Sequence, residues 1–541
     1  MRHVKLLDCT LRDGAYLLDK TFGEVTIKGI IEGLVSANID IVEIGFLQDE
    51  GQGIGKTVFK NSRDAQKYIP KKRGSTIFSV LADYSRYTMD DLDMYTGKSF
   101  DAVRVCFFKQ EKEQMQDACR KVKEKGYLLF VQPVDILGYT DKELLELIDQ
   151  VNELEPYCFS IVDTFGSMYM DDLLRVYHMV HHNLEKNCKI GFHSHNNMQL
   201  SSALSQKMIE ISYGQREAVV DVTISGMGRG AGNTPTELVV QYLVDKRGYN
   251  YGIDAILDLI DQYMTNIRAR CSWGYSTPYF IAGSYGAHVN NIAFLKQKRS
   301  IASKDIRYIL NKIGPEERKR YNYKLLEETY VDYLKSDIDD AWDMCRLQQI
   351  MEGRVVTILA PGPTVGNAEV IQKYIRDKDA IVIAINFIPE HLKCDYLYLN
   401  NIWRYQVLRK TEKFDQICKI YTSNIQNQAE GDYVIRFSRL IKCGWEHMDN
   451  STVMLLRLLD QLHVKEVGIA GLDGYNGENK NYILEDMEQS CEMGYQLMND
   501  EIEDMLCDFL ETRENPFLIR CITKSRFEKV FTSQGELYGT K

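Results

Sequence analysis

Eight short apolar runs, rich in β-branched residues, alternate with helix-like segments through the first 225 residues of the chain. The runs are residues 4–10, 39–46, 75–83, 101–108, 127–133, 157–163, 188–195 and 218–224. Strand and helix alternating in this way predict a parallel sheet, and eight such units in roughly 250 residues are typical of a TIM barrel. A doubly wound sheet is the alternative, but the regular strands and the lack of an early nucleotide fingerprint favour the barrel.

The second half of the 541-residue chain has a different rhythm, as expected of a length that exceeds one hydrophobic core. Charged, helix-like segments dominate residues 250–345. Strand-like runs then return at residues 355–367, 379–387, 394–401 and 465–475. We therefore predict an α/β chain with three regions: a TIM barrel over residues 1–275, a helical extension and linker over 276–350, and a Rossmann-like domain over 351–541.

Composition and charge exclude several classes of protein. Hydrophobic residues are 44% and charged residues 26%, an ordinary balance for a globular chain. The net charge of −11 argues against nucleic acid as the main partner. No apolar run reaches the ~18 residues that span a membrane, and the N-terminus does not resemble a signal peptide. The 13 cysteines include no Cys-x-x-Cys pair, so we expect reduced thiols and a cytoplasmic protein.

Polar side chains gather at the carboxyl ends of the predicted barrel strands. They are Asp8, Glu43, Arg104, Gln132, Asp163, His193, His195 and Ser225. In a barrel these ends converge on the face that carries the active site. A strand can also simply stop at a polar residue, but a packed barrel has few other uses for so many reactive groups. We expect substrate contacts from Arg104, Gln132, Asp163 and Thr164, with a structural role as the alternative for the last two.

His193 and His195 are two positions apart in one extended run. Residues i and i+2 of a strand point to the same side, so both imidazoles face one space. Asp13, in an Arg-Asp-Gly turn after the first strand, can add a carboxylate. Two neutral imidazoles and a carboxylate suit Mn²⁺, Mg²⁺, Co²⁺ or Zn²⁺. The alternatives are packing or chance for the histidines and a surface ion pair for the turn.

Three motifs occur in order on this eight-strand pattern: DCTLRDG at 8–14, GFHSHNN at 191–197 and ISGMGRGAGNTPTE at 224–237. Together they resemble the superfamily of metal-dependent lyases, aldolases and acyl synthases. Its TIM barrels include hydroxymethylglutaryl-CoA lyase, isopropylmalate synthase and 4-hydroxy-2-oxovalerate aldolase. The resemblance implies that Asp13, His193 and His195 bind a divalent metal. It also implies that Asn233 binds the metal or its water and that Arg12 stabilises an enolate oxygen.

The chain departs from this superfamily at the residue expected to move a proton. The well-known aldolases read Arg-Asp-Gly-x-His, and many synthases end in Glu-Gln. Here the sequence is RDGAY, so Tyr16 stands in place of the histidine. A phenol with a pKa near 10 is a poor base unless it is perturbed. The rival base is His288, which lies with Tyr275 and Tyr279 in a segment whose alternative role is packing over the barrel mouth.

The Rossmann-like region carries weaker signals. A Gly-Pro loop after its first strand, an asparagine ending the second and GLDGY ending a later one resemble bacterial sialyltransferases and related nucleotide- or sugar-phosphate-binding domains. The resemblance implies that Gly362, Thr364, Asn386 and Asp473 bind a nucleotide or nucleotide-sugar. The transferases usually place Asn before Gly-Pro-Ser, where this chain has Pro361 and a threonine, and no matching catalytic histidine is evident. The alternative is an α/β domain with a role in assembly.

One main hypothesis of function and two alternatives result. The main hypothesis is a divalent-metal-dependent carbon–carbon lyase or aldolase acting on a 2-oxo acid, through the enolate of pyruvate, and an aldehyde. We expect it to be fused to a nucleotide-binding domain and to form a homo-oligomer. An acyl-CoA-dependent Claisen synthase is one alternative, weakened by the missing Glu-Gln. A non-catalytic barrel that binds metal as a scaffold is the other, and Tyr16 keeps it open.

Overall fold

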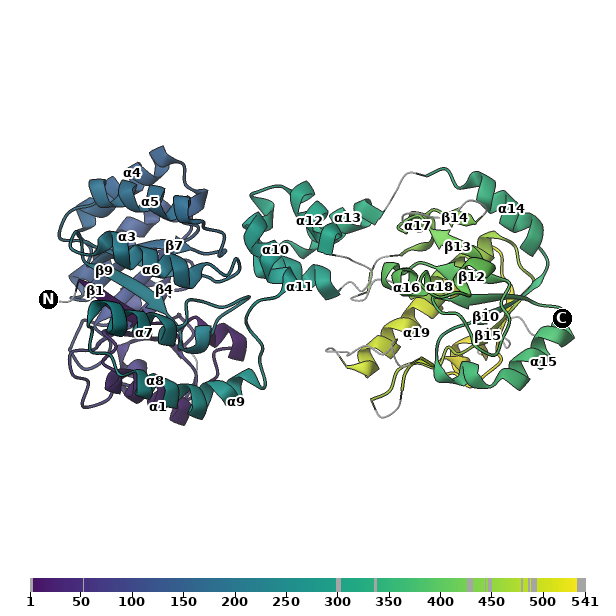
Figure 1. Ribbon diagram of the computed structural model, residues 1–541, viewed down its shortest axis with the longest axis horizontal. Coiled ribbons are helices and arrows are strands. Elements are labelled where there is room, and N and C mark those ends of the chain that lie inside the picture. Colours follow the sequence, from purple (N-terminus) through teal and green to yellow (C-terminus); the bar gives the residue numbers. More distant parts are fainter. Residues whose placement is uncertain are drawn as a thin grey trace. The chain divides into compact units, whose positions relative to one another are not determined.

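The computed structural model describes residues 3–51, 53–297, 303–334, 338–425, 432–442, 444–445, 450–477, 480–484, 487 and 494–532. The chain forms two compact units, one of Met1–Ala293 with Gly314–Tyr321 and one of Phe294–Ile313 with Asn322–Lys541. Each unit has a sheet of its own (Figure 1), which is parallel, and its own hydrophobic core. Among the described helices, none is long and apolar enough to cross a membrane.

The first unit is a closed barrel of eight parallel strands, as the sequence predicts. The strands are β1 (Val4–Asp8), β2 (Ile41–Leu47), β4 (Ile77–Asp83), β5 (Ala102–Phe107), β6 (Leu128–Pro133), β7 (Cys158–Asp163), β8 (Lys189–Ser194) and β9 (Ala218–Val222). Each pairs with the next in this order, and β1 pairs with both β2 and β9, so the ring closes. The two-residue strand β3 (Val58–Phe59) lies beside β2 and is too short to give an apolar run in the sequence.

Helices surround the strands of this barrel (Figure 1). They are α1 (Glu24–Ser36), α2 (Ser62–Gln66), α3 (Lys112–Glu124), α4 (Asp141–Leu154), α5 (Met170–Asn183), α6 (Ser201–Ser212), α7 (Thr236–Arg247) and α8 (Ile253–Leu259). Helix α4 shows why they form. The hydroxyl of Thr140 caps its first turn, and Leu144, Ile148 and Val151 give it one buried apolar stripe. Apolar packing thus holds the scaffold, and the loops beyond the strands can carry polar groups.

Further helices follow the barrel strands, as the sequence predicts. They are α9 (Thr265–Arg268), α10 (Thr277–Tyr285), α11 (Val289–Gln297), α12 (Ser303–Ile313), α13 (Tyr323–Leu334) and α14 (Ala341–Met351). The start of α11 belongs to the barrel unit, whereas α12 and α13 belong to the second unit. The region boundaries at residues 275 and 350 stay predictions.

The second unit is built on a parallel sheet with the strand order β14-β13-β12-β11-β10-β15-β16. Its strands are β10 (Val355–Leu359), β11 (Ile381–Ile385), β12 (Tyr396–Leu399), β13 (Cys418–Thr422), β14 (Tyr433–Ile435), β15 (Glu466–Ala470) and β16 (Leu518–Cys521). Its helices include α15 (Ala368–Lys378), α16 (Ile402–Leu408), α18 (Ser451–Gln461) and α19 (Tyr495–Thr512). The chain winds outward from β10 to β14 and then resumes on the other side of β10. Ligands of such sheets bind beyond the strand ends at this reversal.

Candidate metal centre and active site

Three potential metal ligands meet at the carboxyl end of the barrel. His193 lies in β8, His195 directly follows that strand, and Asp13 lies in the loop after β1. The Nε2 atoms of His193 and His195 lie 3.4 and 3.6 Å from Oδ2 of Asp13. Asp13 and His193 are buried, and the side chain of His195 is 12% exposed. The structure therefore brings together the residues that the His-x-His spacing and the Arg-Asp-Gly turn single out.

Asn233 adds a fourth potential ligand. It pairs with His195 in an isolated β-bridge, and its side-chain Nδ2 donates to the carbonyl of Met227 at 3.1 Å. Its Oδ1 is buried and accepts no hydrogen bond from the residues that the structure describes. A buried acceptor without a donor is costly, so this oxygen is suited to a cation. Asp13, His193, His195 and Asn233, here called the metal cluster, therefore fit a divalent metal ion.

The protonation states of Asp13 and His195 favour cation binding. Burial opposes ionisation of Asp13, but Arg12 and the histidines hold its pKa well below the ordinary value, so the side chain is a carboxylate at neutral pH. Burial lowers the pKa of His195 to about 3, which leaves this imidazole neutral. An ionised carboxylate and a neutral imidazole are the forms that bind metals. Burial opposes protonation of His193, but its contacts with Asp13 and Asp221 raise its pKa above the ordinary value, so a metal has to displace a proton from this imidazole.

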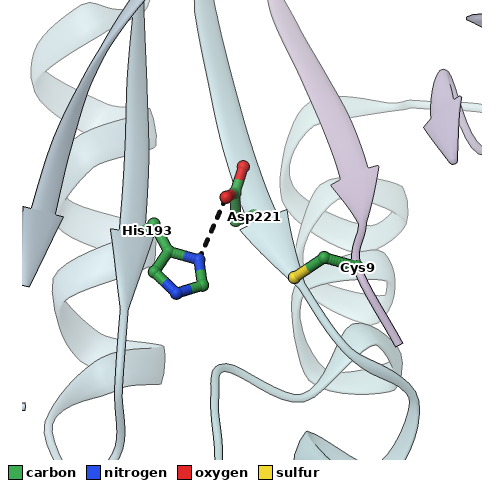
Figure 2. A group of neighbouring side chains, drawn as sticks. All are labelled: Cys9, His193 and Asp221. Atoms are coloured by element: carbon green, nitrogen blue, oxygen red, sulfur yellow. Dashed lines mark hydrogen bonds and ion pairs between the residues drawn. The ribbon is translucent and has the colours of Figure 1, made fainter. Parts of the chain in front are cut away.

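A chain of buried charges connects the metal cluster to the barrel interior. Nε of Arg12 donates to Oε2 of Glu43 at 2.7 Å, and Arg104 donates to the same oxygen at 3.0 Å. Arg104 also donates to Asp221, whose Oδ2 lies 3.0 Å from Nδ1 of His193 (Figure 2). Because a carboxylate can only accept, Nδ1 carries the proton and Nε2 is left as the ligand atom. This engagement of Arg104 favours a positioning role over the predicted substrate contact.

Cys9 lies beside His193 and Asp221 (Figure 2). Its Sγ forms with those two side chains a second group of potential ligand atoms within 4.8 Å of one another. The thiol is buried and donates to the carbonyl of Val222 at 3.4 Å, and burial raises its pKa well above the ordinary value. Arg104 already neutralises Asp221. Cys9 is therefore a protonated core thiol, a weaker ligand than the members of the metal cluster.

The two candidate bases, Tyr16 and His288, differ in protonation. Burial raises the pKa of Tyr16, so its phenol keeps its proton at neutral pH and can only donate it. Burial, with the positive charge of Arg229, lowers the pKa of His288 to about 4. His288 is therefore neutral at pH 7. Its Nδ1 accepts the backbone N–H of Asn290 at 3.2 Å, so the neutral ring carries its proton on Nε2 and only Nδ1 has a lone pair for a further proton. Which of the two residues is the base stays a prediction.

Residues 3–263 match the family model described as HMGL-like, and this stretch contains the whole metal cluster. Over this stretch, which is just under half of the chain, the barrel is similar to the HMGL-like family. The 4-hydroxy-2-oxovalerate aldolase of Pseudoalteromonas translucida is 25% identical over 327 residues, which are 56% of this chain and 89% of the aldolase. An oxaloacetate decarboxylase of Mycobacterium tuberculosis is 25% identical over 295 residues, 52% of this chain and 82% of that protein. The solved HMG-CoA lyase of Brucella melitensis matches at 15% identity and a TM-score of 0.41, covering 50% of this chain and 100% of the lyase.

Three further predicted substrate residues of the HMGL-like barrel are engaged by neighbouring groups. Nε2 of Gln132 donates to the hydroxyl of Ser160 at 2.6 Å. Asp163 accepts from the backbone N–H of Ser167 at 2.9 Å, and burial raises its pKa to about 7. The hydroxyl of Thr164 accepts from a backbone N–H at 2.8 Å. These hydrogen bonds favour a role for the three residues in supporting the loops around the site. Substrate contact by these residues stays a prediction.

Asp221 and Arg229 are not among the site residues predicted from the sequence, and Glu43 is predicted only as a polar strand end. Glu43 and Asp221 each interrupt an apolar strand, β2 and β9, and are buried there. A lone acid inside a buried strand needs a partner, and that requirement is the signal that could have found both. Arg229 stands in a glycine-rich loop, where nothing local marks it.

The predicted nucleotide residues of the second unit lie around one cavity of about 210 Å³ at the reversal between β10 and β15. Gly362, Asn386 and Asp473 line it. Thr364 lies beside it, and its N–H donates to Asp473 at 2.8 Å. A Cβ at position 362 would stand 2.3 Å from the carbonyl oxygen of Gly471, so only glycine fits this turn. The structure brings these four residues together, and their resemblance to a sialyltransferase site stays a prediction.

Proposed function

We propose that the HMGL-like barrel is a divalent-metal-dependent carbon–carbon lyase that converts a 2-oxo acid into pyruvate and an aldehyde, or joins the two. The observation that carries this proposal is the metal cluster. The ligand atoms of Asp13, His193 and His195 lie within 4.8 Å of one another, and Asn233, whose buried amide oxygen accepts no hydrogen bond from the described residues, pairs with His195 in a β-bridge. The similarity to an aldolase and to an oxaloacetate decarboxylase supports it. A 4-hydroxy-2-oxo acid and oxaloacetate both give the enolate of pyruvate when the bond between C3 and C4 breaks.

The aldol reaction balances without a further reactant. In the direction of cleavage, a base takes the proton of the C4 hydroxyl, and the C3–C4 electron pair moves to C3 as the aldehyde forms. Protonation of C3 then gives pyruvate. We assign the hydroxyl proton to His288, because the phenol of Tyr16 keeps its own proton at pH 7. The accepting atom would be Nδ1, which has to give up its hydrogen bond from the backbone N–H of Asn290.

A divalent metal in the cluster would supply Lewis acidity to the 2-oxo acid. Arg12 adds fixed positive charge from this chain. Its Nε is held by Glu43 at 2.7 Å, and its Nη1 lies 3.6 Å from Oδ1 of Asp13. Burial opposes protonation, but these two carboxylates raise the pKa of Arg12 well above the ordinary value, so its charge is permanent. We assign Arg12 to the enolate oxygen, where a preorganised charge stabilises the transition state.

Exchange of the C3 protons of pyruvate into D₂O tests enolisation without any aldehyde. With Mn²⁺ present, we expect exchange by the wild type, loss in His195→Ala, and retention in the control His182→Ala, which removes an exposed imidazole from α5. Carbon–carbon bond formation that requires acetyl-CoA would identify the Claisen synthase instead. Metal binding without exchange or cleavage, over a panel of 2-oxo acids, would leave the scaffold role.

A second role is suggested by the cavity of the Rossmann-like unit. Its place at the reversal of the sheet supports binding of a nucleotide or nucleotide-sugar there. Asn386 has a left-handed φ of 56°, a strained conformation for a side-chain-bearing residue, and its Nδ2 donates to Asn400 at 2.8 Å. Calorimetry with a panel of nucleotides, on the wild type and on Gly362→Ala, tests this role. Binding to neither protein would favour the assembly role, and a homo-oligomer would then be sought by light scattering.

A further inference from the structure

Arg229 has an unusual position for a half-buried cation. It lies in the glycine-rich loop between β9 and α7, and Cζ of its guanidinium stands 3.9 Å from the ring centroid of Tyr16. Among the described residues, no carboxylate forms an ion pair with it, and no acceptor forms a hydrogen bond with its side chain. Arg12 and Arg104, by contrast, each have buried carboxylate partners. Arg229 is thus the arginine beside the site whose charge is left to be balanced by a ligand.

The loop that carries Arg229 is held firmly against the site. The backbone N–H of Ala231 donates to Oδ1 of Asn197 at 3.0 Å, and that of Asn196 donates to the carbonyl of Gly232 at 2.8 Å. On the other side, a Cβ at Gly14 would stand 2.8 Å from Sδ of Met227, so the loop packs on the turn after β1. These contacts place Arg229 between the loop of the metal-cluster histidines and the turn that bears Tyr16.

The charge of Arg229 acts on the reacting end of the site. After burial itself, Arg229 is the cause of the lowered pKa of His288. A guanidinium packed on an aromatic ring keeps N–H donors for a bidentate oxyanion. Arg12 faces Asp13 and is therefore assigned to the 2-oxo acid part of the substrate. Arg229 lies on the side of the two candidates for proton transfer, Tyr16 and His288.

We infer that Arg229 binds an oxyanion, a carboxylate or a phosphate, on the aldehyde half of the substrate. The inference rests on the proposed lyase function and narrows it to an acidic aldehyde, and hence to a 4-hydroxy-2-oxo acid with a second anionic group. That group takes no part in bond making, so Arg229 is a specificity-determining residue. The ring of Tyr16 supports Arg229 by holding its guanidinium in place. A histidine at this position would perform that role less well.

Matched aldehydes test the inference in the direction of synthesis with pyruvate and Mn²⁺. Succinic semialdehyde against butanal reports on a carboxylate, and glyceraldehyde 3-phosphate against glyceraldehyde reports on a phosphate. A charged hydrogen bond predicts a kcat/KM about 10- to 100-fold higher for the anionic member of one pair. Arg229→Gln should bring that ratio close to one, and Arg229→Lys should give an intermediate value. The control is Arg268→Gln, an exposed arginine packed on Trp273 at 4.7 Å, which should keep the wild-type ratio.

Binding of succinate and of inorganic phosphate, measured by calorimetry with Mn²⁺ bound, gives a readout without turnover. About tenfold weaker binding of one anion to Arg229→Gln supports the site. A wild-type ratio near one for both aldehyde pairs, or equal anion binding by the wild type and Arg229→Gln, overturns it. The wild type could also bind an anion that Arg229→Gln does not bind, yet neither exchange pyruvate protons nor form an aldol. That outcome would refute the lyase proposal and keep the anion site.

Discussion

Asp221→Asn is the substitution that most directly tests how the metal cluster is held. Asp221 touches no atom of the predicted metal site except through His193, whose Nδ1 lies 3.0 Å from its Oδ2. The carboxylate fixes the proton on Nδ1 and leaves Nε2 free to bind a metal. An asparagine can present its amide N–H₂ to the same nitrogen, which would move the imidazole proton to Nε2 and block the ligand atom.

The expected loss follows from this geometry. Removal of an outer partner of a metal-binding histidine costs about 10- to 100-fold in metal affinity, or about 1.4–2.8 kcal/mol. Arg104 donates to the same carboxylate, so the substitution also weakens a buried ion pair. We therefore expect Asp221→Asn to fall toward the upper end of that range.

Two measurements check this prediction. Electron paramagnetic resonance of free Mn²⁺ gives the Kd of the wild type, of Asp221→Asn and of the control Asp117→Asn, which removes an exposed carboxylate from α3. The ¹⁵N chemical shifts of His193 in the metal-free protein report which ring nitrogen carries the proton. A folded Asp221→Asn protein with a Kd within about twofold of the wild type, and with Nδ1 still protonated, would refute the reasoning, since a loss of at least tenfold is expected.

Four further outcomes are expected. His195→Ala should lose Mn²⁺ binding and proton exchange together. His195 would be excluded as a ligand if the variant still bound Mn²⁺ in a titration or still exchanged protons. Arg12→Lys keeps a charge but loses the planar fork, so proton exchange should fall about 10²-fold while the Mn²⁺ Kd is unchanged; normal exchange would remove Arg12 from the mechanism. His288→Asn should abolish aldol cleavage, whereas Tyr16→Phe should lower its rate only mildly. The wild-type rate should fall only as pH approaches about 4, where His288 gains a proton, and a fall already at pH 6–7 would contradict this assignment. Burial raises the pKa of Asp8 from 3.8 to about 6, so its contribution to stability is present below pH 4 and lost as pH rises through 6. Urea unfolding should therefore show Asp8→Asn gaining about 2 kcal/mol on the wild type between pH 4 and 7.

The barrel could be predicted because its strands are long enough to give continuous apolar runs, as IVEIGFL does in β2. Strands β13 and β16 escaped prediction because a lysine or an arginine interrupts their apolar residues, and β14 because it has only three residues. The metal cluster could be proposed because period two in a strand fixes where His193 and His195 point. The partners of Arg104 could not be predicted, because Glu43 and Asp221 lie 61 and 117 positions away in the sequence and only closure of the ring brings them to it.

The metal cluster draws its members from the two ends of the barrel sequence, at residues 13 and 233. The chain is synthesised from its N-terminus, and domains fold as units in that order. Asp13 therefore leaves the ribosome long before the histidines and Asn233 exist as partners for it. The full set of ligands comes together only after β9 has paired with β1, which needs none of the strands of the second unit, from Val355 onward. Closure of the ring, rather than completion of the chain, is therefore the step that makes the barrel competent to bind a divalent cation.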